Sequence, residues 1–337
     1  MKPDRADRAL GALTGLAIGD ALGMPTQAFS RPEVERRFGE VLAGFEPGPP
    51  DQPLAPGRAA GSVTDDTDQA MIVAELLIED GGRIDPKKFA SRLVAWEESM
   101  RRRGSLDLLG PSTRRAVREL LAGQPPDQTG RFGATNGAAM RIAPVGVASP
   151  PGPALLEAVV RASFVTHNTS VALAGAAAVA AAVSAAVDGA EPADAVRQGA
   201  AAAGPAARLG HWVAAADVAT RIDWLVGALA PGRTSVLETI GLVGDLVGTS
   251  LATQESVPAA FACVLAFADD PWLAVRVAAS AGGDCDTIAA MTGAILGACH
   301  GSEGFPAPAR RLVAQVNGLD LEPVAAALLR LRERAGG

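Results

Sequence analysis

The stretch SVALAGAAAVAAAVSAAV at residues 170–187 carries no charged side chain and consists mostly of alanine. Alanine has the highest helix propensity of all residues, so this stretch predicts one continuous helix. The run is short for a membrane span, and alanine contributes little to bilayer insertion. A helix that is apolar on all sides is normally covered by protein. We therefore expect a buried core helix, around which the rest of an all-α fold packs.

Apolar residues recur at helical spacing on both sides of this stretch, and no long alternation of β-branched residues competes with them. The spacing predicts helices over residues 9–22, 68–78, 86–100, 112–121, 155–164, 170–187, 213–229, 256–267, 273–281, 287–298 and 323–334. Many alanine and glycine residues lie inside these ranges. Because small side chains let helix axes approach closely, the pattern predicts a dense multi-helix bundle.

Glycine and proline concentrate between the predicted helices, at residues 47–56, 123–133 and 150–153, and mark surface loops there. Asp85 followed by Pro86 fits an N-cap and the first residue of a helix. None of the loops is long enough or polar enough to be an interdomain linker. We therefore expect residues 1–337 to form a single compact all-α domain.

Composition and charge exclude several classes of protein. The chain of 337 residues is 48% hydrophobic and has a net charge of −7, which does not suit a nucleic-acid-binding surface. Cys263, Cys285 and Cys299 form no CxxC pair, which fits a reducing compartment. The first residues include charged side chains and no apolar signal-peptide core. The sequence predicts a cytoplasmic protein that binds neither nucleic acid nor a membrane, and leaves its oligomeric state open.

Two short acidic clusters stand out, TDDTD at residues 64–68 and DCDT at residues 284–287. Each lies beside apolar residues that favour burial, and each precedes a predicted helix; we expect the first of these helices to open at Asp68. Carboxylates held close together in a half-buried setting repel one another and lose hydration, unless a cation lies between them. Oxygen donors of this kind suit Mg²⁺, Mn²⁺ or Ca²⁺ better than Zn²⁺.

Either cluster alone also fits ordinary helix capping, because Asp and Thr are common residues at helix starts. Both clusters, however, have the same layout, with glycine just upstream and a helix downstream. The repeated layout favours a shared cation site over two independent caps.

Four motifs in chain order resemble a known family: GALTGLAIGDALG at residues 11–23, GSVTDDT at 61–67, GAAMR at 137–141 and GGDCDT at 282–287. Together they are similar to the ADP-ribosylglycohydrolase family, also called the dinitrogenase reductase-activating glycohydrolase-like family. The resemblance runs from about residue 8 to about residue 301. It implies the all-α orthogonal bundle of that family.

The resemblance also implies a centre of two Mg²⁺ (or Mn²⁺) ions that binds the ribose hydroxyls of its substrate, and hydrolysis at the anomeric carbon. The substrate would be ADP-ribose linked to a small molecule or to a protein. Carried over by position, the metal ligands are Thr64, Asp65, Asp66, Asp284, Asp286 and Thr287. Asp65, Asp66 and Asp286 are the candidate catalytic residues.

A further set of residues would contact the substrate: Asp20, Gln27, Gly133, Asn136, Gly137, Met140, His167 and Asn168. Small residues over 133–141 would let backbone N–H groups reach phosphate or ribose oxygens. The alternatives are structural: a glycine-rich turn that leads into an apolar segment, and a histidine that is hydrogen-bonded at a helix start.

One position departs from the family pattern. Four residues after the last glycine of the first motif, the family has a glutamate thought to activate or orient water, and this chain has Gln27. An amide can orient water but cannot accept its proton. Either Asp66 or Asp286 accepts the proton instead, or the substrate differs. The sequence thus leaves open hydrolysis of ADP-ribose conjugates, hydrolysis of a nucleoside-like riboside, and ADP-ribose binding without turnover.

Overall fold

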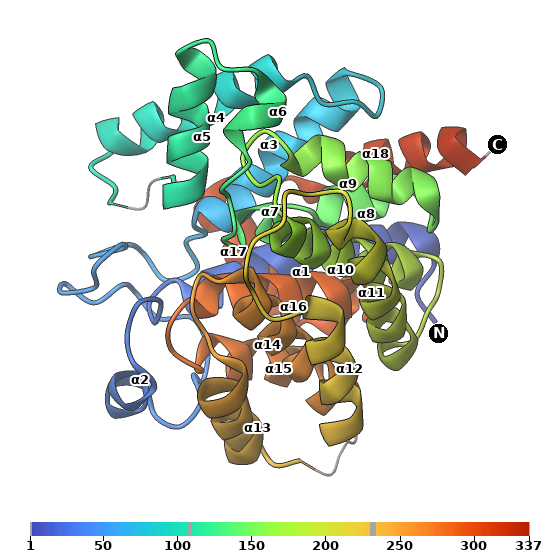
Figure 1. The fold of residues 1–337 in the computed structure, drawn as a ribbon. Helices are drawn as coiled ribbons and strands as arrows, with labels where there is room; N and C mark the ends of the chain where they lie inside the picture. The colour runs from blue at the N-terminus through green and yellow to red at the C-terminus, as the bar shows by residue number, and fades with distance from the viewer. Residues whose placement is uncertain (1, 107–108, 230–233, 337) are drawn as a thin grey trace.

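The computed structural model describes residues 2–106, 109–229 and 234–336 (Figure 1). Within these ranges the chain forms helices and no β-strand, which confirms the all-α prediction. The helices are α1 (Arg5–Gly23), α2 (Arg31–Phe38), α3 (Asp65–Glu79), α4 (Pro86–Arg102), α5 (Pro111–Leu121), α6 (Pro126–Thr129), α7 (Gly137–Met140), α8 (Ala143–Ala148), α9 (Pro153–Ser163), α10 (Ser170–Val187), α11 (Pro192–Ala207), α12 (Val218–Ala228), α13 (Val236–Leu242), α14 (Thr253–Ala266), α15 (Pro271–Ala279), α16 (Cys285–His300), α17 (Ala307–Asn317) and α18 (Leu321–Gly336).

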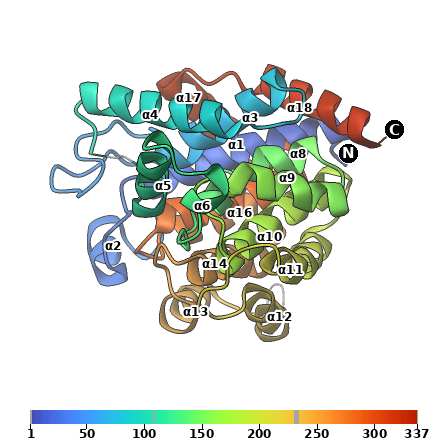
Figure 2. The same cartoon turned by 45° about the horizontal axis from the view of Figure 1, so that its top comes forward.

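Helices α1, α10 and α16 occupy the middle of the molecule (Figures 1 and 2). Helices α3, α4 and α5 lie on one side of this centre, and α12 and α13 lie on the other. Helix α10 has the bounds predicted from its sequence, Ser170–Val187. It is long and apolar enough to cross a membrane, but 94% of it is buried inside the fold. The alanine-rich stretch is therefore a core helix.

A glycine ridge on α1 determines how α1 meets α16. The ridge consists of Gly11, Gly15, Gly19 and Gly23. Residues four apart share one face of a helix, so these four glycines leave a continuous strip of backbone that no side chain of α1 covers. A Cβ atom added at Gly15 would lie 2.0 Å from the carbonyl oxygen of Gly293. At Gly23 it would lie 2.2 Å from the Cα atom of Asp286, so the ridge also positions the second acidic cluster.

Gly19→Ala is expected to destabilise the fold by about 3 kcal/mol, the upper end of the usual cost of overpacking. The new Cβ would lie 2.0 Å from the carbonyl oxygen of Ala289, and backbone cannot swing aside as a side chain can. The matched control is Gly227→Ala on α12, where nothing lies within 4 Å of the added atom. Urea unfolding measures both variants. Equal midpoints for the two would contradict the close packing of α1 on α16.

One predicted helix begins later than its sequence pattern indicated. The spacing predicts a helix over residues 213–229, but residues 213–217 are not helical and α12 begins at Val218. The reason is a cap: the Asp217 side chain accepts a hydrogen bond from the backbone N–H of Thr220 at 2.8 Å. Asp217 therefore ends the preceding loop, although apolar residues continue the helical spacing upstream of it.

Candidate active site

Both acidic clusters lie at the beginnings of helices. Thr64 is the N-cap residue of α3, and its side chain accepts a hydrogen bond from the backbone N–H of Asp66. Asp284 is the N-cap residue of α16. The prediction that the first helix opens at Asp68 is wrong, because the Thr64 cap starts it at Asp65. The carboxylates of the first cluster therefore lie in the first helical turn, where the partial positive charge of the helix N-terminus favours them.

The two clusters meet in space. The Thr287 hydroxyl donates a hydrogen bond to Oδ2 of Asp66 at 3.2 Å, although the two residues are 221 positions apart. Asp66 and Asp286 are buried, with 1% and 3% of their surface exposed. Asp65 is partly exposed and lines a cavity together with Asp286. Oxygen atoms from two helix N-termini thus share one largely buried site.

The electrostatics of this site fit a bound cation. Burial raises the pKa of Asp66 well above its usual range, and the neighbouring carboxylates, led by Asp286, raise it further. Oδ1 of Asp66 is buried and accepts no hydrogen bond from any residue that the structure describes. A divalent cation would supply both the positive charge and the missing partner for this oxygen. Since the converging donors are all oxygens, they suit Mg²⁺ or Mn²⁺.

The carboxylates do not form a ligand set by themselves. Among the residues that the structure describes, no three Asp, Glu, His or Cys side chains are grouped as metal ligands. A cation here would depend on the hydroxyls of Thr64 and Thr287 and on water as well as on carboxylates. Such mixed coordination is usual for Mg²⁺, which keeps several of its waters in protein sites.

Asp20 lies beneath the first cluster and does not line the cavity. Its carboxylate is fully buried and accepts hydrogen bonds from the backbone N–H groups of Thr64 and Thr67, both at 3.0 Å. The hydroxyls of the same two threonines also donate to it. With its oxygens occupied by these donors, Asp20 is placed to fix the start of α3 rather than to contact a substrate.

A cavity of about 290 Å³ opens beside the two clusters. Asp65, Asp284, Asp286 and Thr287 line it, as do four residues of the predicted substrate set: Gln27, Asn136, Gly137 and Met140. The other four members of that set, Asp20, Gly133, His167 and Asn168, do not line it. The carbonyl oxygen of Gly133 instead accepts a hydrogen bond from the Thr169 hydroxyl at 2.6 Å. Asn168 donates to the backbone of Asp127 at 3.3 Å.

Asn136 connects the 133–141 loop to the second acidic cluster. Its side-chain amide donates to Oδ2 of Asp284 at 2.5 Å and to the Ser256 hydroxyl at 2.9 Å. Burial raises the pKa of Asp284, and the hydrogen bonds from Asn136 and Thr287 oppose that rise. Asn136 therefore holds one carboxylate of the cluster in place, and it lines the cavity at the same time.

A buried arginine is linked to the first acidic cluster through a glutamine. The Arg141 guanidinium is fully buried and donates to Oε1 of Gln69 at 2.9 Å. The Gln69 amide in turn donates to Oδ2 of Asp65 at 2.8 Å. Burial lowers the pKa of Arg141 to about 9, and the negative charge of Asp65 opposes this shift. Arg141 therefore orients Asp65 through Gln69.

His167 reaches the cavity only through another side chain. It is fully buried, with Nδ1 at 2.8 Å from the Thr166 hydroxyl and Nε2 at 2.9 Å from the Thr135 hydroxyl. Burial, followed by the charge of Arg141, lowers its pKa well below the usual range, so the ring is neutral at physiological pH. Thr135, rather than His167, lines the cavity.

Sequence reasoning missed several residues that line the cavity: Leu54, Leu109, Thr113, Arg114, Thr135 and Leu251. Thr135 lies within residues 133–141, which the sequence already indicated as a substrate-binding segment, so it could have been predicted. The others come from loops and from α5, which carry no motif. No pattern in the sequence indicates that these segments face the acidic clusters.

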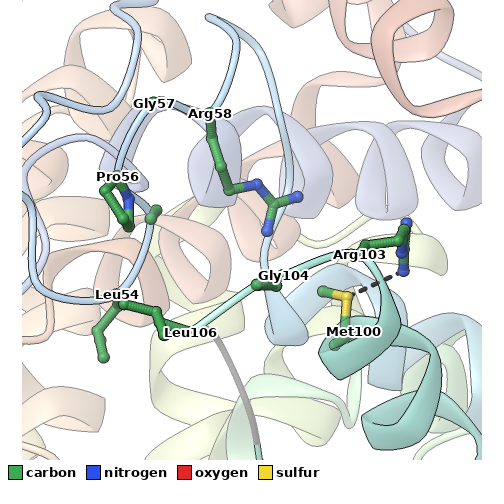
Figure 3. Close-up of a pocket in the computed structure, with 10 residues that line it drawn as sticks. Leu54, Pro56, Gly57, Arg58, Met100, Arg103, Gly104 and Leu106 are labelled. Carbon is green, nitrogen blue, oxygen red and sulfur yellow. Dashed lines mark hydrogen bonds between the residues drawn. The ribbon is translucent and has the colours of Figure 1, made fainter.

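A second cavity, of about 320 Å³, shares two lining residues with the first, and Figure 3 shows its lining. Leu54 and Leu106 line both cavities and thus form their common boundary. The second cavity is also lined by Arg58 and Arg103, whose side chains appear in Figure 3. The first cavity is lined by the carboxylates of Asp65, Asp284 and Asp286 and by the Arg114 guanidinium, whereas the charged side chains given for the second are Arg58 and Arg103.

The site is thus a group of carboxylates and hydroxyls at two helix N-termini, beside a cavity of an all-α fold. The chain belongs to the ADP-ribosylglycohydrolase family, whose model matches residues 1–337. It is 34% identical to the uncharacterized protein YegU of Escherichia coli over 334 residues, 98% of each chain. It is 28% identical to the ADP-ribosylarginine hydrolase Tri1 of Pseudomonas putida, over 91% of this chain and 74% of that one. A solved structure, an ADP-ribosylglycohydrolase-related protein complex, superposes with a TM-score of 0.66 at 28% identity, over 97% of this chain and 99% of that one.

Proposed function

We propose that this protein is a cytoplasmic, Mg²⁺- or Mn²⁺-dependent hydrolase that cleaves the glycosidic bond at the anomeric carbon of ADP-ribose conjugates. The observation that carries the proposal is the contact between Thr287 and Asp66, 3.2 Å long, which joins the two acidic clusters beside the cavity. Membership of the ADP-ribosylglycohydrolase family and the likeness to an ADP-ribosylarginine hydrolase support the choice of substrate.

The residues that would hold the cations are Thr64, Asp65, Asp66, Asp284, Asp286 and Thr287. A pair of divalent cations would supply a clamp for a vicinal diol and lower the pKa of a bound water. The protein itself positions the carboxylate and hydroxyl oxygens that would bind these cations. Asp20 fixes Thr64 and the first turn of α3, and Asn136 fixes Asp284.

A ribose ring in the first cavity would have its hydroxyls against the acidic clusters and its outer edge against the 133–141 loop. The short loop side chains allow close approach of backbone, and Gly137 has no space for a larger residue, since an added Cβ would lie 2.8 Å from the His167 ring. Met140 and Leu109 cover the apolar side of the cavity. Apolar walls exclude water from an oxocarbenium-like transition state and strengthen the electrostatic interactions around it.

The acceptor for the proton of the attacking water is a carboxylate of the clusters. Gln27 lines the cavity but has no group that can accept a proton. We assign this role to Asp286, which lines the cavity, or to Asp66, which is buried beside Thr287 and does not line it. Asp65 is partly exposed and also lines the cavity.

Hydrolysis of a nucleoside-like riboside by the same site is the second candidate. It is favoured by Gln27, whose side-chain nitrogen is buried without a hydrogen-bond partner among the described residues. Such a donor suits an acceptor on a substrate that differs from those of relatives with glutamate here. A panel of ADP-ribosyl-arginine, ADP-ribosyl-serine, O-acetyl-ADP-ribose and free ribonucleosides tests both candidates. Cleavage of ribonucleosides alone would replace the first candidate by the second, and cleavage of none would contradict both.

Gln27→Glu is expected to raise the rate of hydrolysis of ADP-ribosylated protein by about 100-fold, because it adds a positioned general base. The rate on free ribonucleosides should not rise. Steady-state kinetics on the two substrate types measures the difference, and circular dichroism controls for folding. If the variant accelerates neither substrate, a carboxylate at position 27 adds no general base, and the view that Gln27 sets substrate choice through proton transfer is wrong.

A further inference from the structure

Exposed apolar side chains concentrate in one part of the chain. Seven of the thirteen large apolar side chains that are exposed among the described residues lie within residues 209–251. They are Leu209, Trp212, Trp224, Val226, Leu237, Leu246 and Leu251. Trp212 is the most exposed of the thirteen, with 81% of its surface open to solvent. Single exposed apolar residues are normal, but such a concentration around an exposed tryptophan indicates a surface that another molecule covers.

The backbone on both sides of Trp212 is fixed, although most of its side chain is exposed. The N–H of His211 donates to the carbonyl oxygen of Asn168 at 2.9 Å, and the carbonyl oxygen of His211 accepts from the N–H of Ser170 at 2.7 Å. The N–H of Val213 donates to the Ser170 hydroxyl at 3.3 Å. An apolar anchor on an ordered backbone loses little conformational entropy on binding, which favours association.

An open hollow of about 560 Å³ lies beside Trp212, which forms part of its lining. Its walls come from the start of α10, the end of α11, the 208–217 loop and the start of α12 (Figure 1). Alanine and valine make up most of the lining. The hollow shares no lining residue with the two cavities near the acidic clusters, so it is a separate site. An apolar side chain that protrudes and an apolar hollow thus lie next to each other.

The charged residues that line the hollow are one of each sign, Arg208 and Asp217. Neither forms an ion pair with any residue that the structure describes. Oδ1 of Asp217 caps α12, and a carboxylate can accept another donor at its second oxygen. The two charges cancel, whereas the whole chain has a net charge of −7. Because copies of an acidic chain repel each other at long range, contact between two copies is favoured where the local charge cancels.

We propose that the hollow and the 208–217 loop form the interface of a symmetric homodimer. A two-fold axis brings the same surface of both copies together, so every contact occurs twice. Trp212 of each copy would enter the hollow of the other, and Arg208 of each would pair with Asp217 of the other. A buried tryptophan contributes roughly 150–250 Å², a substantial part of the about 800 Å² that each partner buries in a stable interface.

The same features favour a second copy over a membrane. A surface that binds anionic lipid gathers several basic side chains, whereas the hollow has one, and an acidic residue accompanies it. A second copy, in contrast, supplies both the tryptophan that fits the hollow and the opposite charge for each lining residue. The inference does not depend on the proposed function, because it uses no residue of the acidic clusters.

Sedimentation equilibrium of the wild type and two variants tests the interface. At about 100 μM the wild type is expected to approach twice the 34.1 kDa of one chain, since interfaces of standard size have micromolar or lower dissociation constants. Trp212→Ser should raise the dissociation constant by at least about 30-fold, the usual effect of removing a tryptophan at a hot spot. The control is Leu121→Ser on α5, which is 64% exposed and does not line the hollow. It should dimerise like the wild type. A monomeric wild type, or a Trp212→Ser protein with unchanged dimerisation, would overturn the inference.

Two charge reversals test the predicted ion pairs. Arg208→Asp alone and Asp217→Arg alone would each place two pairs of like charges in a homodimer, so each variant should be monomeric. An equal mixture should form a heterodimer, because one pair is then native, the other is reversed, and both are attractive. Circular dichroism checks that α12 persists without its Asp217 cap. A mixture of folded variants that stays monomeric would overturn the inference. If Asp217→Arg does not fold, the Arg208→Asp protein decides alone, and unchanged dimerisation of it would overturn the inference.

Flotation with vesicles of phosphatidylcholine and phosphatidylserine distinguishes a dimer interface from a lipid-binding surface. The wild-type dimer should not float with the vesicles, because its exposed tryptophans are covered. Flotation of the wild type that Trp212→Ser abolishes would overturn the inference and assign the surface to a membrane.

Discussion

Asp286→Asn is expected to reduce kcat on an ADP-ribosylated substrate by at least about 1,000-fold, which corresponds to about 4 kcal/mol of transition-state stabilisation. The amide has nearly the same shape as the carboxylate, but it cannot neutralise a divalent cation or accept a proton. Asp286 lines the cavity and is 3% exposed, so no solvent group can replace it. Its position at the start of α16 also links it to the glycine ridge of α1.

The same substitution should not destabilise the cation-free protein. Asp286 is the neighbouring charge that raises the pKa of Asp66 most, after the effect of burial. Removing it relieves a repulsion between buried like charges, so we expect the melting temperature measured in chelator to stay constant or rise. Loss of activity without loss of stability is typical of a functional residue.

The control for this experiment is Asp223→Asn, an exposed aspartate on α12. It should change neither kcat nor the melting temperature. Two results would contradict the assignment of Asp286: a variant that keeps more than a tenth of wild-type kcat, or one that loses activity and several degrees of melting temperature together in the absence of cation. The second result would indicate that Asp286 serves the fold.

The sequence alone predicted the helices that have an unbroken apolar pattern. Helix α10 has its predicted bounds, and α3, α14 and α16 differ from prediction only near their ends. Helices α11 and α17 were not predicted. Helix α11 contains Gly199 and Pro205, which locally indicate a break. In the fold Gly199 serves packing instead, because a Cβ there would lie 2.7 Å from the ring of Phe261.

For the site, the sequence identified the acidic clusters but not the distances between side chains. The pattern of Asp and Thr residues at 64–68 and 284–287 was visible, and the family resemblance suggested that the two clusters meet. The position of Asp20 beneath Thr64 was not predictable, since it depends on how α1 crosses the start of α3. His167 was assigned to the substrate, yet tertiary packing places Thr135 in front of it.

Several sequence-based predictions remain predictions, among them that residues 1–337 form a single domain, that the protein is cytoplasmic, and that the six cluster residues are metal ligands. The ligand assignment has the largest consequences for the proposed chemistry, because the ribose, the water and the proton acceptor all depend on it.

Removal of divalent cations is the second change with a large expected effect. Treatment with a chelator should abolish hydrolysis, and Mg²⁺ or Mn²⁺ should restore it, whereas Zn²⁺ should restore much less because the converging donors are all oxygens. The cause would be the loss of the positive charge that balances Asp66, Asp286 and their neighbours and that would lower the pKa of the attacking water. Activity that is indifferent to chelation would contradict cation-dependent catalysis.

The most direct measurement counts the Mn²⁺ ions bound per chain after equilibrium dialysis, for the wild type and for Asp66→Asn. Asp66 provides the clearest test, because its buried Oδ1 has no hydrogen-bond partner among the described residues and its Oδ2 joins the clusters. We predict two Mn²⁺ ions per wild-type chain and at most one per variant chain. A wild-type protein that binds no Mn²⁺, or a variant that binds as many ions as the wild type, would contradict the proposal that the two acidic clusters form one metal centre.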